Sequence, residues 1–135
     1  MYQQMIFVNL ATNDVAASRK FFTELGYSIN PQFSTDDCSC VVISDTIIAM
    51  LLSKQRYADF TKKEIADSTK TSEVLICLSA ESREEVDELV EKAVAAGGTA
   101  NLDVQDQGFM YGRSFDDLDG HSWEVVWMDP AAVQG

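Results

Sequence analysis

The segment DDLDGHSWEVVW, residues 116–127, decides how the rest of the chain is interpreted. It combines a turn-forming Asp-Gly pair with His121, the only histidine of the chain, and then alternates large apolar residues over positions 123–127. Because strand side chains alternate between two faces, these apolar residues are expected on one covered face and Glu124 on the other. The segment therefore predicts a turn followed by a strand that presents Glu124.

The same order of elements occurs twice along the chain, and residues 116–127 end the second copy. Residues 5–11 are typical of a strand, and residues 12–26 have the apolar spacing of a helix that ends at a glycine. Residues 73–79 are again strand-like, and residues 82–96 form a second helical pattern that opens with a capping box. Three short β-rich segments follow each helix. The order β-α-β-β-β is thus predicted twice.

These patterns predict an α+β fold in which residues 1–135 form one domain. Module one spans residues 1–52, module two spans residues 73–135, and the polar connector 53–72 is expected to hold a short helix near residues 57–66. A module of this size cannot bury its sheet alone. We therefore expect the two modules to form an open, curved, barrel-like sheet around a cleft, with the helices outside.

Composition and charge restrict the partners. The chain has 135 residues and a net charge of -12, of which residues 73–135 contribute -11 from 3 basic and 14 acidic residues. A surface this acidic repels phosphate groups, so neither nucleic acid nor an anionic membrane is an expected partner. Three cysteines fit no disulfide framework, and no apolar run approaches a membrane span, which favours a cytoplasmic protein.

Three segments carry a resemblance to a known family: FVNLATNDVAASRKFFTELGY (7–27), SREEVDELVEKAVAAGG (82–98) and DDLDGHSWE (116–124). They resemble the vicinal oxygen chelate superfamily, which includes glyoxalase I, extradiol dioxygenases, fosfomycin-resistance thiol transferases and bleomycin-binding proteins. The last segment is similar to the superfamily signature D-P-D-G-H/N-x-x-E, with Leu118 in place of the proline. The resemblance implies the fold described above and covers nearly the whole chain.

The resemblance also implies a metal site. In the superfamily, two side chains from each module converge on a divalent metal, and the corresponding positions here are Phe7 and Met50 in module one and Glu73 and Glu124 in module two. Phenylalanine offers no donor atom, and a thioether suits only soft ions. We therefore expect no cofactor, or at most a weakly held divalent cation at the two glutamates.

Glu73 and Glu124 are also the candidate catalytic residues. If the two carboxyl groups lay close together in a partly dry cleft, one pKa would rise and the pair would share a proton, as general acid/base chemistry requires. The alternative for each is an ordinary solvated carboxylate at the end of a sheet.

Five residues are candidates for contact with a ligand, namely Phe7, Asn9, Met50, Tyr111 and Arg113. Asn9 should share the inward face of Phe7, where it could bind a ligand or be a satisfied buried amide. Arg113 could anchor an anion, although an internal ion pair is favoured in so acidic a half of the chain. His121 is interpreted as a turn residue, because it precedes Glu124 by three positions.

Two functions follow from these residues. The first is a glyoxalase-like protein that binds or transforms a small organic molecule without the full metal site of the superfamily. The alternative is a metal-dependent lyase, isomerase or thiol transferase of the glyoxalase I type. By the same resemblance, the chain is expected to form a homodimer.

Overall fold

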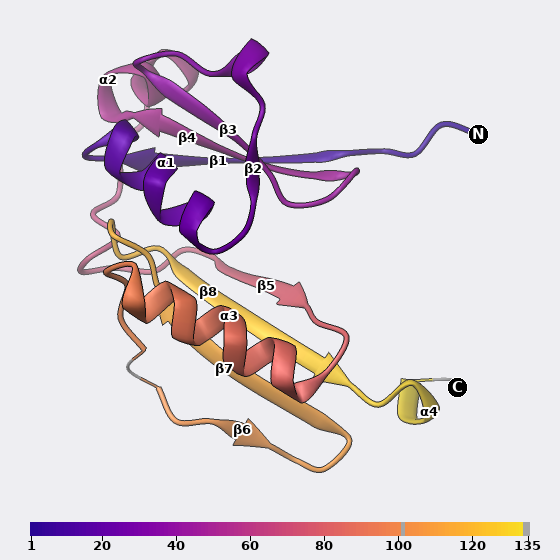
Figure 1. Cartoon of the computed structure of the whole chain (residues 1–135). Helices are drawn as coiled ribbons and strands as arrows, with labels where there is room; N and C mark the ends of the chain where they lie inside the picture. The colour runs from indigo at the N-terminus through magenta and orange to yellow at the C-terminus, as the bar shows by residue number, and fades with distance from the viewer. Residues whose placement is uncertain (101, 134–135) are drawn as a thin grey trace. The chain divides into compact units, whose positions relative to one another are not determined.

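The computed structural model describes residues 1–100 and 102–133, and the chain divides into two compact units, residues 1–67 and 68–135 (Figure 1). Each unit is built around its own four-stranded sheet. None of the helices in the described residues is long and apolar enough to span a membrane.

Unit one has the predicted β-α-β-β-β order. Its elements are β1 (Ile6–Thr12), α1 (Val15–Glu24), β2 (Ser28–Ile29), the short 3-10 helix η1 (Pro31–Phe33), β3 (Cys38–Val42), β4 (Ile47–Ser53), α2 (Lys54–Tyr57) and η2 (Ala58–Phe60). The strand order in the sheet is β1-β4-β3-β2. β1 and β4 run parallel, and the other neighbours are antiparallel.

Unit two repeats this arrangement. Its elements are β5 (Leu75–Ser79), α3 (Arg83–Ala95), β6 (Gln105–Asp106), β7 (Met110–Asp116), β8 (Ser122–Met128) and α4 (Pro130–Val133). The strand order is β5-β8-β7-β6, with β5 and β8 parallel. The duplicated module and the α+β class predicted from the sequence are therefore confirmed.

The helix predicted in the connector begins earlier than expected. It was predicted near residues 57–66, whereas α2 starts at Lys54, directly after β4. The Ser53 side chain explains the shift, since its hydroxyl accepts a hydrogen bond from the Arg56 amide at 3.0 Å and so caps the helix where the strand ends.

Both long helices begin at a side-chain cap, and the cap at the start of α3 is the one predicted from the sequence. Asp14 caps α1, and Ser82 caps α3 by accepting a hydrogen bond from the Glu85 amide at 3.1 Å. After each helix the chain turns at a glycine with positive φ, +107° at Gly26 and +110° at Gly97. Only glycine adopts this left-handed conformation at low cost, so the two glycines end equivalent helices.

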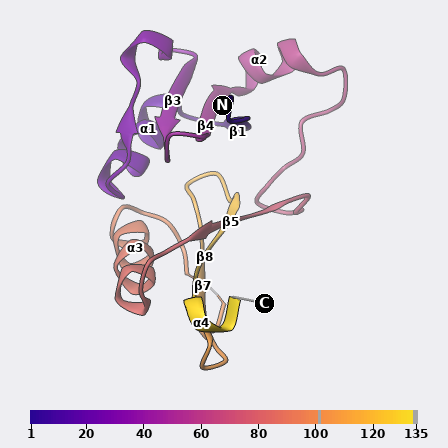
Figure 2. The same cartoon turned by 90° about the vertical axis from the view of Figure 1, so that its right-hand side faces the viewer.

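One helix covers one face of each sheet (Figures 1 and 2). In unit one the Thr12 and Ser18 hydroxyls lie 2.6 Å apart beneath α1, and buried Phe21 and Phe22 meet edge to face. In unit two, α3 packs against β7 and β8 over the buried Trp123. The other face of each sheet carries the side chains of alternate positions.

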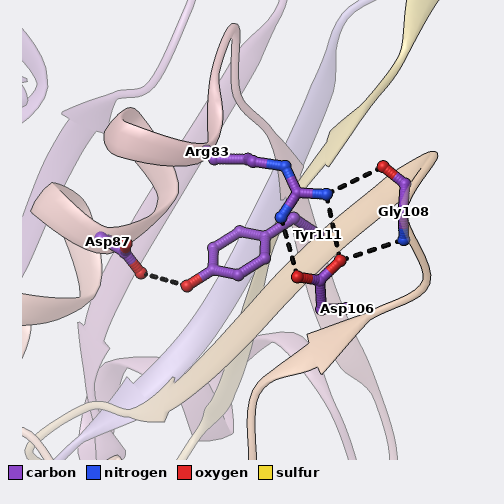
Figure 3. Close-up of polar contacts among 5 residues, drawn as sticks. All are labelled: Arg83, Asp87, Asp106, Gly108 and Tyr111. Atoms are coloured by element: carbon purple, nitrogen blue, oxygen red, sulfur yellow. Dashed lines mark hydrogen bonds and ion pairs between the residues drawn. The ribbon is translucent and has the colours of Figure 1, made fainter.

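Arg83, at the start of α3, joins the helix to the β6–β7 hairpin (Figure 3). Its guanidinium donates to both Asp106 carboxylate oxygens at 2.9 and 3.0 Å and to the Gly108 carbonyl at 2.8 Å. It also lies 5.0 Å from the Tyr111 ring centre and 5.2 Å from that of Trp127. Hydrogen bonding to Arg83 is the main reason that the pKa of Asp106 is lowered to about 2.

A buried aspartate, Asp117, organises the turn between β7 and β8. One carboxylate oxygen accepts hydrogen bonds from the Asp119 and His121 amides, and the other accepts one from the Trp123 indole, each at 3.0 Å. Burial raises the pKa of Asp117, while His121 and the three donors lower it by a smaller amount. His121 closes this turn through its backbone, donating to the Asp117 carboxylate and accepting from the Asp117 amide at 3.0 Å.

The turn is also held from outside by the chain that precedes β5. The Ser68 hydroxyl donates to the Asp119 carbonyl at 2.6 Å. Gly120 has a φ of +86°, and a Cβ at this position would lie 2.8 Å from the Ser68 carbonyl oxygen. Glycine is therefore required here for both the backbone conformation and the close approach.

Replacement of Asp117 should destabilise the fold. Asp117→Ala leaves the Trp123 indole and two amides without their acceptor, which should cost about 3 kcal/mol or more. Asp117→Asn keeps one carbonyl oxygen and should cost less, about 1–3 kcal/mol. Urea unfolding of each variant measures these costs. The exposed Asp103→Ala is the control, and equal stability of Asp117→Ala and Asp103→Ala would contradict the role of Asp117.

Candidate functional site

Glu124 lies on the face of the second sheet that α3 does not cover. The β8 residues on either side of it, Trp123 and Val125, are fully buried beneath the helix. In the strand register Glu124 stands opposite Cys77 of β5 and Ser114 of β7, so the three side chains share one face. The predicted orientation of Glu124 is consistent with this register, and its two cross-strand neighbours are a thiol and a hydroxyl.

The surroundings of Cys77 disfavour its thiolate. Partial burial raises the pKa of its thiol, and the negative charge of Glu124 raises it further. A thiol with a raised pKa is a poor nucleophile at neutral pH, because the thiolate is the reactive form. Of this pair, Glu124 is therefore the group suited to accept a proton or a hydrogen bond.

Glu73 does not lie beside Glu124, contrary to the expectation of a carboxylate pair. β5 begins at Leu75, so Glu73 precedes the strand and is exposed. The residue opposite Glu124 is Cys77, four positions after Glu73, which corresponds to about 13 Å along an extended chain. The two glutamates therefore do not form the acid/base or cation-binding pair that the sequence suggested.

The helix caps show that the residue of unit two equivalent to Phe7 lies two positions after Glu73. Phe7 lies seven positions before the α1 cap, Asp14, and the residue seven positions before the α3 cap, Ser82, is Leu75. The strand registers agree, because Phe7 pairs with β4 as Leu75 pairs with β8. Leu75 is thus the structural counterpart of Phe7.

In unit one, Asn9 and Met50 are register partners on the face that α1 does not cover. Phe7 shares that face and is 55% exposed. Asn9 is exposed as well, and its side-chain amide donates to the Phe7 carbonyl at 3.3 Å, so it is not a buried amide. The three residues predicted to contact a ligand in this unit therefore share one sheet face.

Tyr111 and Arg113 lie on the opposite face from Glu124, contrary to the expectation that they line the same site. The Tyr111 hydroxyl donates to the Asp87 carboxylate of α3 at 2.6 Å, and Arg113 donates to the same oxygen at 3.0 Å. The hydrogen bond from Tyr111 is the main cause of the lowered pKa of Asp87. The favoured alternative for Arg113, an internal ion pair, is confirmed.

The regularity of β7 explains this placement. A bulge at Gly112 would have made the face of its neighbours uncertain, but β7 pairs with β8 without interruption from Met110 to Asp116. Ser114 therefore takes the position beside Glu124, and Tyr111 and Arg113 turn to the helix. Counting in steps of two from Glu124 across the hairpin would have identified Ser114.

The donor atoms do not fit the divalent metal site implied by the resemblance. In the described part of the chain, no three or more His, Cys, Asp or Glu residues are grouped as metal ligands. Glu124 has the Cys77 thiol and the Ser114 hydroxyl as neighbours, and the positions in unit one that the resemblance assigns to ligands are Phe7 and Met50. A transition metal in a catalytic site typically needs three nitrogen, sulfur or carboxylate ligands from the protein.

Comparisons with known proteins agree with this architecture. A model of the bleomycin resistance protein-like N-terminal family matches residues 4–44. The structure of hypothetical protein SA1046 from S. aureus is 31% identical, covers 94% of this chain and 95% of its own, and has a TM-score of 0.77. A comparison with curated proteins finds no match.

Two further structures share the fold at lower identity. Lactoylglutathione lyase from Agrobacterium tumefaciens is 16% identical, with 93% of this chain and 94% of that chain covered and a TM-score of 0.67. The fosfomycin resistance protein FosX from Listeria monocytogenes is 19% identical, with 94% of each chain covered and a TM-score of 0.67. The chain thus shares its fold of duplicated β-α-β-β-β modules with these glyoxalase-type and fosfomycin-resistance structures, and its residues 4–44 match the bleomycin resistance protein-like N-terminal family.

Proposed function

We propose that the protein binds a small organic molecule on the sheet face that carries Glu124, and that it does so without the divalent metal of the superfamily that it resembles. The observation that carries this proposal is the placement of Glu124 beside the Cys77 thiol and the Ser114 hydroxyl on a face that α3 leaves uncovered. These groups can donate and accept hydrogen bonds, and small-molecule sites are typically apolar surfaces with a few such groups.

The charges of unit two leave Glu124 available to a ligand. The three basic residues after residue 73 form ion pairs elsewhere, Arg83 with Asp106, Lys92 with Glu88 and Arg113 with Asp87. Among the described residues, Glu124 takes part in none of the salt bridges. A ligand with an N–H or O–H group would therefore meet a carboxylate that no protein cation neutralises, and a charge-assisted hydrogen bond is stronger than a neutral one.

Glu124 also supplies the group that a reaction would need. A carboxylate beside a protonated thiol can remove a proton from a bound substrate, whereas the thiol itself is not activated for attack. The structure thus supports binding with Glu124 as acceptor, and proton transfer to Glu124 if the ligand is transformed.

The alternative is a metal-dependent lyase, isomerase or thiol transferase. The fold is shared with a lactoylglutathione lyase and with a fosfomycin resistance protein, which favours this class as the second candidate. It would require a metal held by donors other than Phe7 and Leu75.

Pairing into a homodimer and a cytoplasmic location remain predictions from the sequence.

Elemental analysis separates the two functions. We expect protein purified without chelator to carry much less than one equivalent of Zn, Ni, Fe or Mn, because the positions of Phe7 and Met50 offer no hard donor. Weak binding of Mg²⁺ or Ca²⁺ at millimolar concentration is compatible with this expectation. One equivalent of a transition metal that disappears in Glu124→Gln would establish the metalloenzyme instead.

A thermal-shift screen of small amides, amines, thiols and antibiotics tests the role of Glu124. A ligand present at one hundred times its Kd should stabilise the protein by about 2.7 kcal/mol. Glu124→Gln should weaken such a ligand by about 1.5–3 kcal/mol, or more than about tenfold, because a charged acceptor is lost. Glu91→Gln, an exposed change on α3, is the matched control. Equal affinity of all three proteins would place the site elsewhere.

The reactivity of Cys77 tests its proximity to Glu124. The raised pKa of Cys77 predicts slow reaction with a disulfide reagent near pH 8, since little thiolate is present. Glu124→Gln removes the negative charge, so the pKa should fall and the rate–pH profile should move to lower pH. The measurement uses a Cys38→Ser background, in which Cys77 is the accessible thiol. An unchanged profile would mean that Glu124 does not act on Cys77.

A further inference from the structure

Three sulfur-containing side chains lie on one face of the first sheet. Cys40 of β3 stands directly opposite Met50 of β4 in the antiparallel register. Cys38 is two residues before Cys40 on the same strand, so its side chain projects from the same face. This is the face that α1 does not cover, because the intervening Ser39 hydroxyl accepts a hydrogen bond from Arg19 of α1.

The spacing of these side chains suits joint coordination of one ion. Directly opposed residues of an antiparallel pair have Cβ atoms about 4.5–5.5 Å apart, and residues two apart on a strand are separated by about 7 Å. Metal–sulfur bonds of about 2.3 Å hold sulfur atoms about 4 Å apart. Rotation about the Cα–Cβ bonds can bring the sulfur atoms closer together than the Cβ atoms are, because each sulfur lies beyond its Cβ.

The three side chains differ in burial. Cys40 is 5% exposed, and Cys38 and Met50 are half-buried. The Cys38 thiol donates to the Phe33 carbonyl at 3.5 Å and lies 3.5 Å from the Thr35 hydroxyl.

The surroundings of the cluster select the kind of ion. The other residues that this face contributes to the β3–β4 ladder are Val42, Ile48 and Leu52, which are apolar, and the nearest polar side chains are Asn9 beside Met50 and Thr35 beside Cys38. Two thiolates and a thioether suit a soft monovalent ion, and methionine sulfur in particular favours Cu(I) over divalent hard ions.

We propose that Cys38, Cys40 and Met50 form a binding site for Cu(I) in unit one. The ion binds without oxidation or reduction, displacing one proton from each thiol and accepting a lone pair from the thioether. The site differs from the divalent metal site of the superfamily in its donors and in its strands, and it does not depend on the proposed role of Glu124.

Anaerobic titration with Cu(I), in competition with a chromophoric Cu(I) chelator, tests the proposal. The expected result is one tightly bound equivalent per chain, with thiolate-to-copper absorption in the near ultraviolet. Cys38→Ser should reduce the affinity at least a hundredfold, and Met50→Leu about tenfold, since each removes one ligand while keeping the size of the side chain. Cys77→Ser is the matched control and should bind as the parent protein does.

The choice of variants separates loss of copper binding from loss of the fold. Cys40→Ser places a hydroxyl in a buried position and could unfold the protein, so Cys38→Ser and Met50→Leu, at half-buried positions, decide the outcome after their fold is checked by circular dichroism. Unchanged copper affinity in the Cys38→Ser, Met50→Leu double variant would overturn the site. Loss of copper only in Cys77→Ser would overturn it as well and place the ion in unit two.

Discussion

The arrangement of the second sheet depends on the burial of Trp123 between α3 and the turn before β8. Its indole donates to the buried Asp117 carboxylate at 3.0 Å, and its ring stacks parallel to Phe115, with ring centres 6.3 Å apart. A slip of one residue in β8 would break both contacts and would move Glu124 to the helix-covered face. The same anchor therefore stabilises the core and determines which side chains of β8 lie on the face away from α3.

The duplication supplies two equivalent frameworks, but their uncovered faces have diverged. The position of Asn9 beside Met50 in unit one corresponds to that of Cys77 beside Glu124 in unit two. The backbone requirements, a cap before each helix and a glycine after it, are retained in both. The chemistry differs because Phe7, Asn9 and Cys77 are exposed and lie outside the buried core, so they can change without loss of helix packing.

The sequence predicted most of the fold because the responsible signals are local. Helix caps, glycine stops and two-residue alternation each act over a few positions, and they identified both modules and the orientation of β8. The exact start of β5 is not a local property, since it depends on pairing with β8. The strand-like pattern of residues 73–79 therefore places Glu73 in the predicted strand, although β5 begins at Leu75. The face on which Tyr111 and Arg113 lie is not a local property either, because both contact Asp87 of α3, which is 24 and 26 residues earlier in the chain.

Asp117 illustrates a signal that the sequence contained but that composition arguments could not recognise. An aspartate in an acidic segment is normally a solvated residue, and its burial becomes evident only when the three donors of the turn are placed around it.

The two uncovered faces thus differ in the hardness of the donors that they present. Unit two carries the excess negative charge, and the carboxylate of Glu124 on its uncovered face suits hydrogen-bond donors. Residues 1–72 have a net charge of -1, from 7 basic and 8 acidic residues, and the face of the first sheet away from α1 presents three sulfur atoms beside the Asn9 amide. A hydrogen-bond donor and a soft cation would therefore engage different atoms, the carboxylate oxygens of Glu124 in unit two and the sulfur atoms of unit one.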